Sequence, residues 1–266
     1  MSIPRFWVSE IADTKLLALD AQESQHALTS LRLKVGDEVI LFDGRGQEVL
    51  ARISDVARRS VTTELIQRLD SDRELRSPLH LFIALPKGDR QRTLVEGLVQ
   101  LGATQLSPLC CHRGVAQPTG NAVNRLKKMV IEACKQSGRN QLMEVTEPIQ
   151  LCELAKGAAG NSSVLTRSYI AHPYGAATPL SEIVRNSAAT AVTQIAIGPE
   201  GGFVDEEVER FIRAGWQQVS LGKRILRIEM AAMYCAAWHA LHNEQVNDRL
   251  QHHALSQQDD LGKPNS

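Results

Sequence analysis

The sequence has no long apolar run, no excess of charge and no cysteine motif, and each absence excludes a class of protein. No apolar stretch approaches the length of a membrane-spanning helix, and no charged-then-apolar leader precedes a cleavage site. The five cysteines are odd in number and contain no Cys-x-x-Cys motif, which argues against a disulfide framework and against a zinc site. We therefore expect a cytoplasmic protein that binds no metal.

The equal numbers of basic and acidic side chains, 30 of each, conceal a local asymmetry. Residues 77–150 carry nine basic and five acidic side chains. Glu132 is the one acid among a run of basic residues, which are Arg113, Arg125, Lys127, Lys128, Lys135 and Arg139. A basic patch on a neutral protein can bind nucleic acid, although charge alone favours an ordinary solvated helix face.

The pattern of apolar residues divides the chain into two domains and a tail. Residues 1–72 contain short strand patterns with tight turns, such as Asp43-Gly44-Arg45-Gly46, and predict a small β-barrel. After a charged linker, residues 77–246 alternate strand and helix patterns, which predicts a parallel α/β sheet. Residues 247–266 are polar, and we expect them to form a disordered tail.

Two glycine-marked turns, about twenty residues apart, each lead from an apolar strand into a helix. They read Ile197-Gly198-Pro199-Glu200-Gly201-Gly202-Phe203 and Leu221-Gly222-Lys223-Arg224-Ile225-Leu226-Arg227. Open α/β sheets bind ligands outside the carboxyl ends of their strands, and only glycine lets the backbone approach a ligand closely. Tight turns alone would explain one such motif, but two in succession predict a ligand site.

The side chains of the first turn limit the ligand. A phosphate-binding loop offers bare backbone N–H groups and often a lysine, whereas this loop carries Glu200, with Asp205 and Glu206 close behind. A pyrophosphate would meet that carboxylate at close range. No G-x-G-x-x-G motif follows the first strand of the domain, which argues against a dinucleotide-dependent enzyme on a Rossmann sheet. We infer a cofactor without phosphates and take S-adenosyl-L-methionine as the candidate.

The two turns, continued through Glu229-Met230-Ala231, resemble the signature of the ribosomal RNA small subunit methyltransferase E family of the SPOUT superfamily. Residues 26–37, 86–90 and 132–139 extend the resemblance, which covers the chain to about Leu241. It implies an N-terminal PUA-like β-barrel that binds RNA and a C-terminal parallel α/β sheet with a deep trefoil knot. It also implies methylation of N3 of a uridine in small-subunit (16S) ribosomal RNA, with S-adenosylmethionine as the cofactor.

The resemblance further implies the partners of the chain. These are ribosomal RNA or the assembled small ribosomal subunit, and a second copy of the chain in a homodimer. The final helix pattern, about 229–245, is apolar nearly all round. Packing against a partner subunit would bury such a helix, although a place in the centre of the core would do so equally well. The chain departs from the family pattern at Glu96–Gly102 and at Met230, mostly on the expected RNA side. A noncatalytic or retargeted RNA-binding member of the family is therefore the alternative.

The two turns and one histidine supply the candidates for the cofactor pocket. The predicted cofactor-binding residues are His172, Ile197, Gly198, Pro199, Glu200, Gly201, Gly202, Leu221, Gly222, Ile225 and Leu226. We expect most of their contacts with the cofactor to come from the backbone. His172 would close the pocket, although a lone histidine is more often structural.

Methylation at N3 requires a proton acceptor, together with a cation for the carbonyl oxygens of an unpaired base. Arg227 and Glu229 are the catalytic candidates, although a salt bridge or the helix dipole could equally explain Glu229. The predicted RNA-binding residues are Arg5, Arg32, Lys87, Arg90, Arg113 and Arg139. They come from both domains, so we expect the RNA to lie across the cleft between them.

Overall fold

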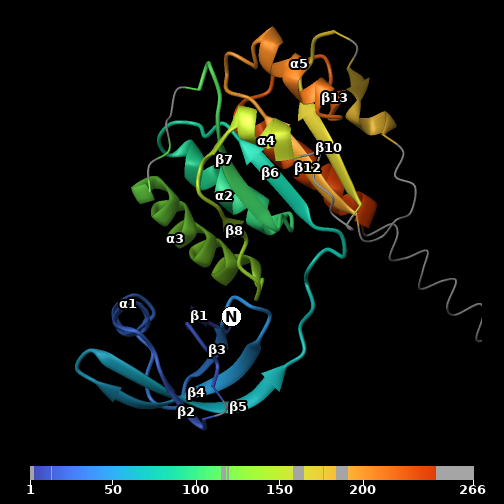
Figure 1. The fold of residues 1–266 in the computed structure, drawn as a ribbon. Coiled ribbons are helices and arrows are strands. Elements are labelled where there is room, and N and C mark those ends of the chain that lie inside the picture. The colour runs from blue at the N-terminus through green and yellow to red at the C-terminus, as the bar shows by residue number, and fades with distance from the viewer. Residues whose placement is uncertain are drawn as a thin grey trace, which may run out of the picture. The chain divides into compact units, whose positions relative to one another are not determined.

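The computed structural model describes residues 3–12, 14–114, 118, 120–157, 165–175, 177–183 and 191–243 (Figure 1). The predicted tail, 247–266, lies outside these residues. Contacts divide the chain into two compact units. The first unit comprises Met1–Glu74 and Lys127–Met143, and the second comprises Leu75–Leu126 and Glu144–Ser266.

The first unit is built on a five-stranded sheet. Its strands are β1 (Arg5–Trp7), β2 (Leu16–Ala18), β3 (Glu38–Phe42), β4 (Glu48–Ala57) and β5 (Ser60–Leu69), in the spatial order β1-β3-β4-β5-β2. β1 is parallel to β3, and the other pairs are antiparallel. The predicted turn joins β3 to β4, where Gly44 and Gly46 adopt positive φ angles of 76° and 103°. Asp43 Oδ1 accepts the backbone N–H groups of Arg45 and Gln47 and so fixes this turn.

Two short helical segments, α1 (Ala21–Gln25) and the π-helix η1 (His26–Ser30), complete the core of the first unit. Ala27 of η1 is buried in one cluster with Phe6 of β1 and with alternate residues of β4. That alternation is the period of two expected for strands with one buried face. The expected β-rich N-terminal unit is therefore present.

The segment Lys127–Met143 groups with the first unit through buried charges. It includes the second half of α3 (Gly120–Ser137), where Lys135 contacts the Glu23 carboxylate and lies 2.9 Å from Glu132 Oε1. Arg139 is 4% exposed, and its Nε donates to Glu74 Oε1 at 2.9 Å. The helical pattern of α3 gave no sign of this grouping. The domain boundary expected between residues 72 and 77 stays a prediction.

Glu48 is the centre of an ion cluster in the same unit. It is 2% exposed and accepts hydrogen bonds from Arg5 and from Arg73, the latter at 3.0 Å. Arg5 also donates to the carbonyl oxygen of Arg139 at 3.1 Å and lies 5.0 Å above the ring of Phe42. Arg5 and Arg73 are therefore both bound by a carboxylate that is buried from solvent.

We expect Glu48→Ala to lower the free energy of unfolding by about 3 kcal/mol, because it leaves the buried Arg5 guanidinium without its carboxylate. Urea denaturation measures this loss. Glu38→Ala is the control, since it breaks a pair with Arg52 in which both side chains are about half exposed, and it should cost less than about 1 kcal/mol. Equal losses for the two variants would contradict the structural role of Glu48.

The second unit contains a parallel sheet, as the alternating pattern predicts. Its strands are β6 (Leu79–Ile83), β7 (Gln105–Cys110), β8 (Glu144–Val145), β9 (Ile149–Gln150), β10 (Thr166–Ala171), β11 (Thr178–Pro179), β12 (Val192–Ile197) and β13 (Gln217–Ser220). The spatial order is β11-β13-β10-β12-β6-β7-β8, with β9 beside β7. Every pair of neighbours in this sheet is parallel.

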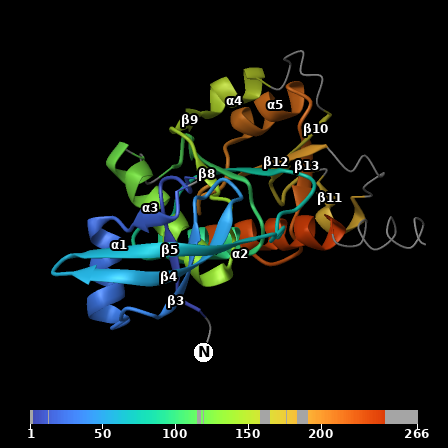
Figure 2. The ribbon, with the colours of Figure 1, turned by 90° about the horizontal axis from the view of Figure 1, so that it is seen from below.

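Helices cover both faces of this sheet (Figure 2). One face carries α4 (Leu151–Gly157) and α5 (Asp205–Arg213), and the other carries α2 (Arg90–Gln100) and the final helix, described over 228–243. The short 3-10 turn η2 (Leu180–Glu182) follows β11. None of the described helices is long and apolar enough to cross a membrane.

Close packing joins α2 to the final helix. A Cβ atom on Gly97 would lie 2.4 Å from the sulfur of Met233, so a larger residue at that point of α2 would require the methionine side chain to move. Tyr169 of β10 meets Trp238 of the final helix edge to face, with ring centroids 6.1 Å apart. These contacts fix the final helix against the sheet and thereby position the loop that precedes it.

Candidate functional site

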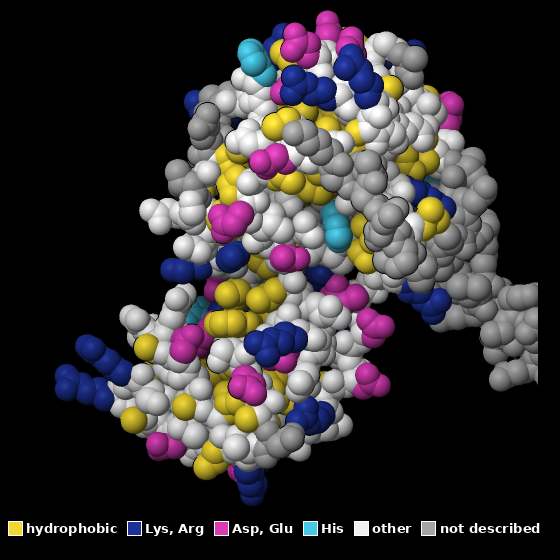
Figure 3. All heavy atoms as spheres, in the orientation of Figure 1, with side chains coloured by type: hydrophobic (Ala, Val, Ile, Leu, Met, Phe, Trp, Pro, Cys, Tyr) yellow, Lys and Arg dark blue, Asp and Glu magenta, His cyan; other side chains and the backbone are white. Residues whose placement is uncertain are grey.

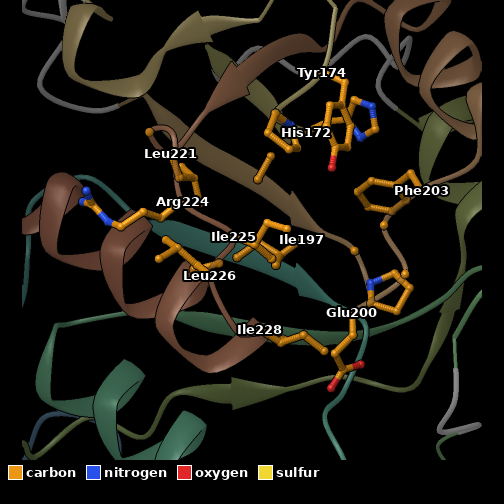
Figure 4. Close-up of a pocket in the computed structure, with 18 residues that line it drawn as sticks. His172, Tyr174, Ile197, Glu200, Phe203, Leu221, Arg224, Ile225, Leu226 and Ile228 are labelled. Atoms are coloured by element: carbon orange, nitrogen blue, oxygen red, sulfur yellow. The ribbon is translucent and has the colours of Figure 1, made fainter.

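A pocket lies at the carboxyl ends of three neighbouring strands, β12, β10 and β13 (Figure 4). Ala171 pairs with Ile197 on one side and with Val219 on the other, so the three loops leave the sheet at one level. All the predicted cofactor-binding residues line this pocket. The sequence did not single out the remaining lining residues, which are Ala171, Pro173, Tyr174, Phe203, Arg224, Ile228 and Ala231. The role of any of them in binding stays a prediction.

Aromatic side chains form one end of the pocket (Figure 4). The rings of His172 and Tyr174 meet at 74° with centroids 5.5 Å apart, and Phe203 is buried nearby. Burial lowers the pKa of His172, against a weaker opposing effect of Asp205. The imidazole is therefore neutral at pH 7 and adds no positive charge to the pocket.

Charged side chains gather around the loop that follows β12. Arg90 Nη1 lies 2.8 Å from Glu200 Oε1 and 3.9 Å from Glu229 Oε2. Glu229 is 5% exposed, and its Oε2 is buried without a hydrogen-bond partner among the described residues. One guanidinium group is thus placed between a partly exposed carboxylate of the pocket and a buried one.

Glycine is favoured at different positions of the two turns for different physical reasons. Gly202 and Gly222 adopt φ angles of 69° and 102°, and an added Cβ would meet no atom within 4 Å at either position. Backbone conformation therefore demands glycine at both. Gly198 has no such angle, but its Cβ would lie 3.1 Å from the ring of Phe203. A side chain at this position would therefore require the Phe203 ring to shift slightly.

Glu207 holds the first pocket loop in place. One of its carboxylate oxygens accepts the backbone N–H of His112 at 2.7 Å, and the other accepts that of Val204 at 2.9 Å. Arg113 donates to the carbonyl oxygen of Gly201 at 2.7 Å. These bonds tie the loop after β7 to the loop after β12. Sequence reasoning missed Glu207, although an acid three residues after the N-cap, here Val204, is well placed to accept the N–H of that residue.

The predicted catalytic and RNA-binding residues differ in their exposure and in their ion pairs. Glu229 is buried beside Arg90, whereas Arg227 is exposed and is not among the residues that line the pocket. Arg5 and Arg139 are engaged in the ion pairs of the first unit. Three further predicted RNA-binding residues have exposed side chains, and they are Arg32, Lys87 and Arg113. The phosphate-binding role given to all these basic residues stays a prediction.

Two family models match most of the described chain. Residues 73–240 match an RNA methyltransferase domain, and residues 19–66 match an RNA methyltransferase PUA domain. A ribosomal RNA small subunit methyltransferase E from Rickettsia conorii is 31% identical over 86% of this chain and 91% of its own length. The chain belongs to the ribosomal RNA small subunit methyltransferase E family.

Other members of the family are also similar to this chain. The enzyme of that name from Synechocystis sp. is 35% identical to this chain. The match covers 74% of this chain and 63% of the length of the Synechocystis protein. A solved structure of the methyltransferase E from Neisseria gonorrhoeae is 28% identical, covers 89% of this chain and 96% of its own, and superposes with a TM-score of 0.80. That structure holds S-adenosyl methionine. The family match confirms the PUA-like unit and the parallel α/β unit that the sequence predicts.

Proposed function

We propose that this chain methylates N3 of a uridine in small-subunit ribosomal RNA and uses S-adenosyl-L-methionine as the methyl donor. The observation that carries the proposal is the pocket after β10, β12 and β13, which carries a carboxylate where a phosphate-binding loop would offer bare N–H groups. Family membership and the cofactor held by the gonococcal relative support S-adenosylmethionine as the ligand of this pocket. The trefoil knot that the family implies belongs to the same proposal.

The residues that line the pocket are compatible with that cofactor. When bound, S-adenosylmethionine supplies a methyl group carried on a positively charged sulfur. Glu200 places a carboxylate, paired with Arg90, in the lining, and His172, whose pKa is lowered by burial, adds little positive charge. Ile197, Leu221 and Leu226 offer apolar surface for an adenosine, beside turns in which glycine leaves the backbone open.

The chain must also remove the proton of N3, which lies on the Watson–Crick edge of the base. Glu229 is the proposed acceptor, because its buried Oε2 has no hydrogen-bond partner among the described residues. A cation is needed where negative charge develops on the carbonyl oxygens beside N3. The sequence proposed Arg227 for this task, and the structure also brings Arg90 near Glu229.

Exposed basic side chains are proposed to bind the RNA backbone. Arg32 lies in the first unit, and Lys87 and Arg113 lie in the second. Arg58 and Arg59, which sequence reasoning did not select, form the exposed turn of the β4–β5 hairpin. Basic side chains project at the lower left of Figure 3, where this hairpin ends in Figure 1. Their attraction for phosphates would weaken as salt rises.

A homodimer is part of the proposal. The final helix exposes Met230, Tyr234 and Leu241, which are 51%, 44% and 58% accessible in the single chain. Ile225, in the loop before this helix, is 88% accessible. An apolar surface of this kind is typical of a contact between subunits. The expected place of action is the cytoplasm, where small ribosomal subunits are found.

Methyl transfer to small-subunit RNA tests the proposal. We expect the purified chain, given labelled S-adenosylmethionine, to label small-subunit RNA that lacks the modification, offered naked or as assembled subunits. Nuclease digestion and mass spectrometry should then locate the methyl group on N3 of one uridine. RNA binding without transfer would favour the noncatalytic alternative. A methyl group on a different atom would overturn the N3 assignment.

A further inference from the structure

Arg90 lies where three segments of the second unit meet, namely the start of α2, the loop after β12 and the start of the final helix. It is the first residue of α2 and follows the loop after β6, the strand beside β12. Its guanidinium reaches Glu200 in the loop after β12 and lies near Glu229 at the start of the final helix. The sequence suggested a phosphate ligand, but this placement puts Arg90 beside the pocket and between two carboxylates.

The contact with Glu229 is incomplete. The 3.9 Å between Arg90 Nη1 and Glu229 Oε2 is too long for a hydrogen bond, although the two charges attract each other. Oε2 is nonetheless buried, and an acceptor withdrawn from water without a donor is costly. The site therefore presents an unused acceptor with a cationic donor next to it.

This pair complements a base edge that offers an N–H donor beside a carbonyl acceptor. The imide of uracil has an N–H donor with a carbonyl acceptor on each side, so it offers a donor to Glu229 and an acceptor to Arg90. Guanine shares part of this pattern through its N1–H and O6, whereas cytosine and adenine present a bare acceptor nitrogen at the corresponding edge position and lack it. The pair thus favours uracil or guanine over cytosine and adenine, and the proposed function selects uracil.

Building on the proposed function, we propose that Arg90 is a catalytic residue that donates to a carbonyl oxygen of the target uracil while Glu229 accepts the N3 proton. Glu200 holds the guanidinium in place at 2.8 Å before the base arrives. Arg227 is exposed, whereas Arg90 is paired with a carboxylate of the pocket lining and lies 3.9 Å from Glu229, so the role is assigned to Arg90.

The step balances in atoms and charge. The N3–H bond breaks, and its proton passes to Glu229 Oε2. The electron pair left on N3 forms the bond to the methyl carbon, while the pair of the carbon–sulfur bond leaves with sulfur, which becomes neutral. Arg90 meets the negative charge that develops on the carbonyl oxygen during this exchange, and preorganised donors of this kind lower the barrier.

A purely structural role for Arg90 is the competing explanation. Its pair with Glu200 is about one third to one half exposed on both sides, and such pairs contribute little to stability. Loss of the pair should therefore leave the fold intact. That property lets a variant separate chemistry from folding.

The experiment compares Arg90→Gln with Arg92→Gln in the methyl-transfer assay. Arg92 lies on the same helix, is exposed and pairs at 3.6 Å with Glu96, so its loss removes the same charge away from the pocket. We expect kcat to fall roughly 100-fold for Arg90→Gln, with cofactor Kd changed less than about twofold, and to stay at the wild-type value for Arg92→Gln. Added guanidinium ions should restore part of the turnover of Arg90→Ala.

Three results would overturn the assignment. Unchanged kcat in Arg90→Gln would exclude a part in chemistry. A raised KM for RNA at constant kcat would show a phosphate contact instead. A loss of cofactor binding equal to the loss of turnover would show a role in shaping the pocket. If the wild-type chain methylates no uridine, the proposed function itself fails, whereas an active wild type with an equally active Arg90→Gln overturns this inference alone.

Discussion

Ala231→Phe should abolish the binding of S-adenosylmethionine, with a rise in Kd of roughly 100-fold or more. Ala231 lies in the first turns of the final helix and lines the pocket, where it is 7% exposed. Its backbone is inside the helix, so its Cβ is the part that faces the pocket. A phenyl ring there would occupy space that the proposed cofactor needs, without changing any backbone angle. Isothermal titration of both proteins with S-adenosylmethionine measures the effect.

Met230→Phe is the matched control for this variant. Met230 is the neighbour of Ala231 on the same helix, is 51% exposed and does not line the pocket. It should bind the cofactor like the wild type and show the same ligand-induced rise in melting temperature. Ala231→Phe should melt near the ligand-free wild type and show no such rise, because a ligand stabilises only a protein that binds it. Wild-type affinity in Ala231→Phe would place the cofactor elsewhere.

The glycine turns are less suitable for blocking the pocket, although the sequence points to them first. A Cβ on Gly201 would meet the Cδ of Arg113 at 3.2 Å, at the flexible part of a side chain that can move aside. Gly202 and Gly222 have positive φ angles, so a substitution there would strain the backbone and change the loop itself. A variant of the helix leaves both turns unaltered and therefore tests occupancy of the pocket.

Local patterns predicted the pocket well because its determinants are local. Both turns join the end of one strand to the next helix, and glycine, proline and the apolar strand residues mark each junction within a few positions. The parallel order of the strands then brings separate loops to one edge of the sheet. His172 was predicted only as a lone candidate, and the register of Ala171 against Ile197 explains why it meets the same pocket.

Long-range ion pairs were beyond sequence reasoning. Arg5 is an isolated cation near the start of the chain and Arg139 belongs to the basic run of residues 113–139. Their partners Glu48 and Glu74 lie 43 and 65 positions away in the chain. Nothing in the spacing of charges shows which carboxylate a guanidinium will meet after folding. The same limit applies to Arg90, which sequence reasoning predicted to bind RNA and which the fold brings to Glu200. The sequence therefore shows where the basic residues are in the chain, whereas the fold determines which carboxylate each of them contacts.

Glu229→Gln should lower the turnover of methyl transfer by roughly 100-fold to 10,000-fold at pH 7, with cofactor affinity unchanged. The amide keeps the size of the side chain but cannot take the N3 proton. Because Oε2 is buried without a hydrogen-bond partner among the described residues and lies 3.9 Å from Arg90, the carboxylate gains little from the fold to offset its burial. Removing the charge should therefore leave the melting temperature at or above the wild-type value. Single-turnover kinetics with bound RNA, together with thermal melting, measure both effects.

Glu206→Gln controls for the other explanation of Glu229, an acid favoured by the helix dipole. Glu206 is exposed in the first turn of α5 and would lose the same dipole interaction, worth about 0.3–1 kcal/mol. It should keep full turnover with slightly lower stability. The turnover of Glu229→Gln should recover as pH rises, because the imide of uridine then loses its proton to solvent. Turnover that stays low at every pH would assign Glu229 to the architecture of the final helix, and full turnover at pH 7 would remove it from the reaction.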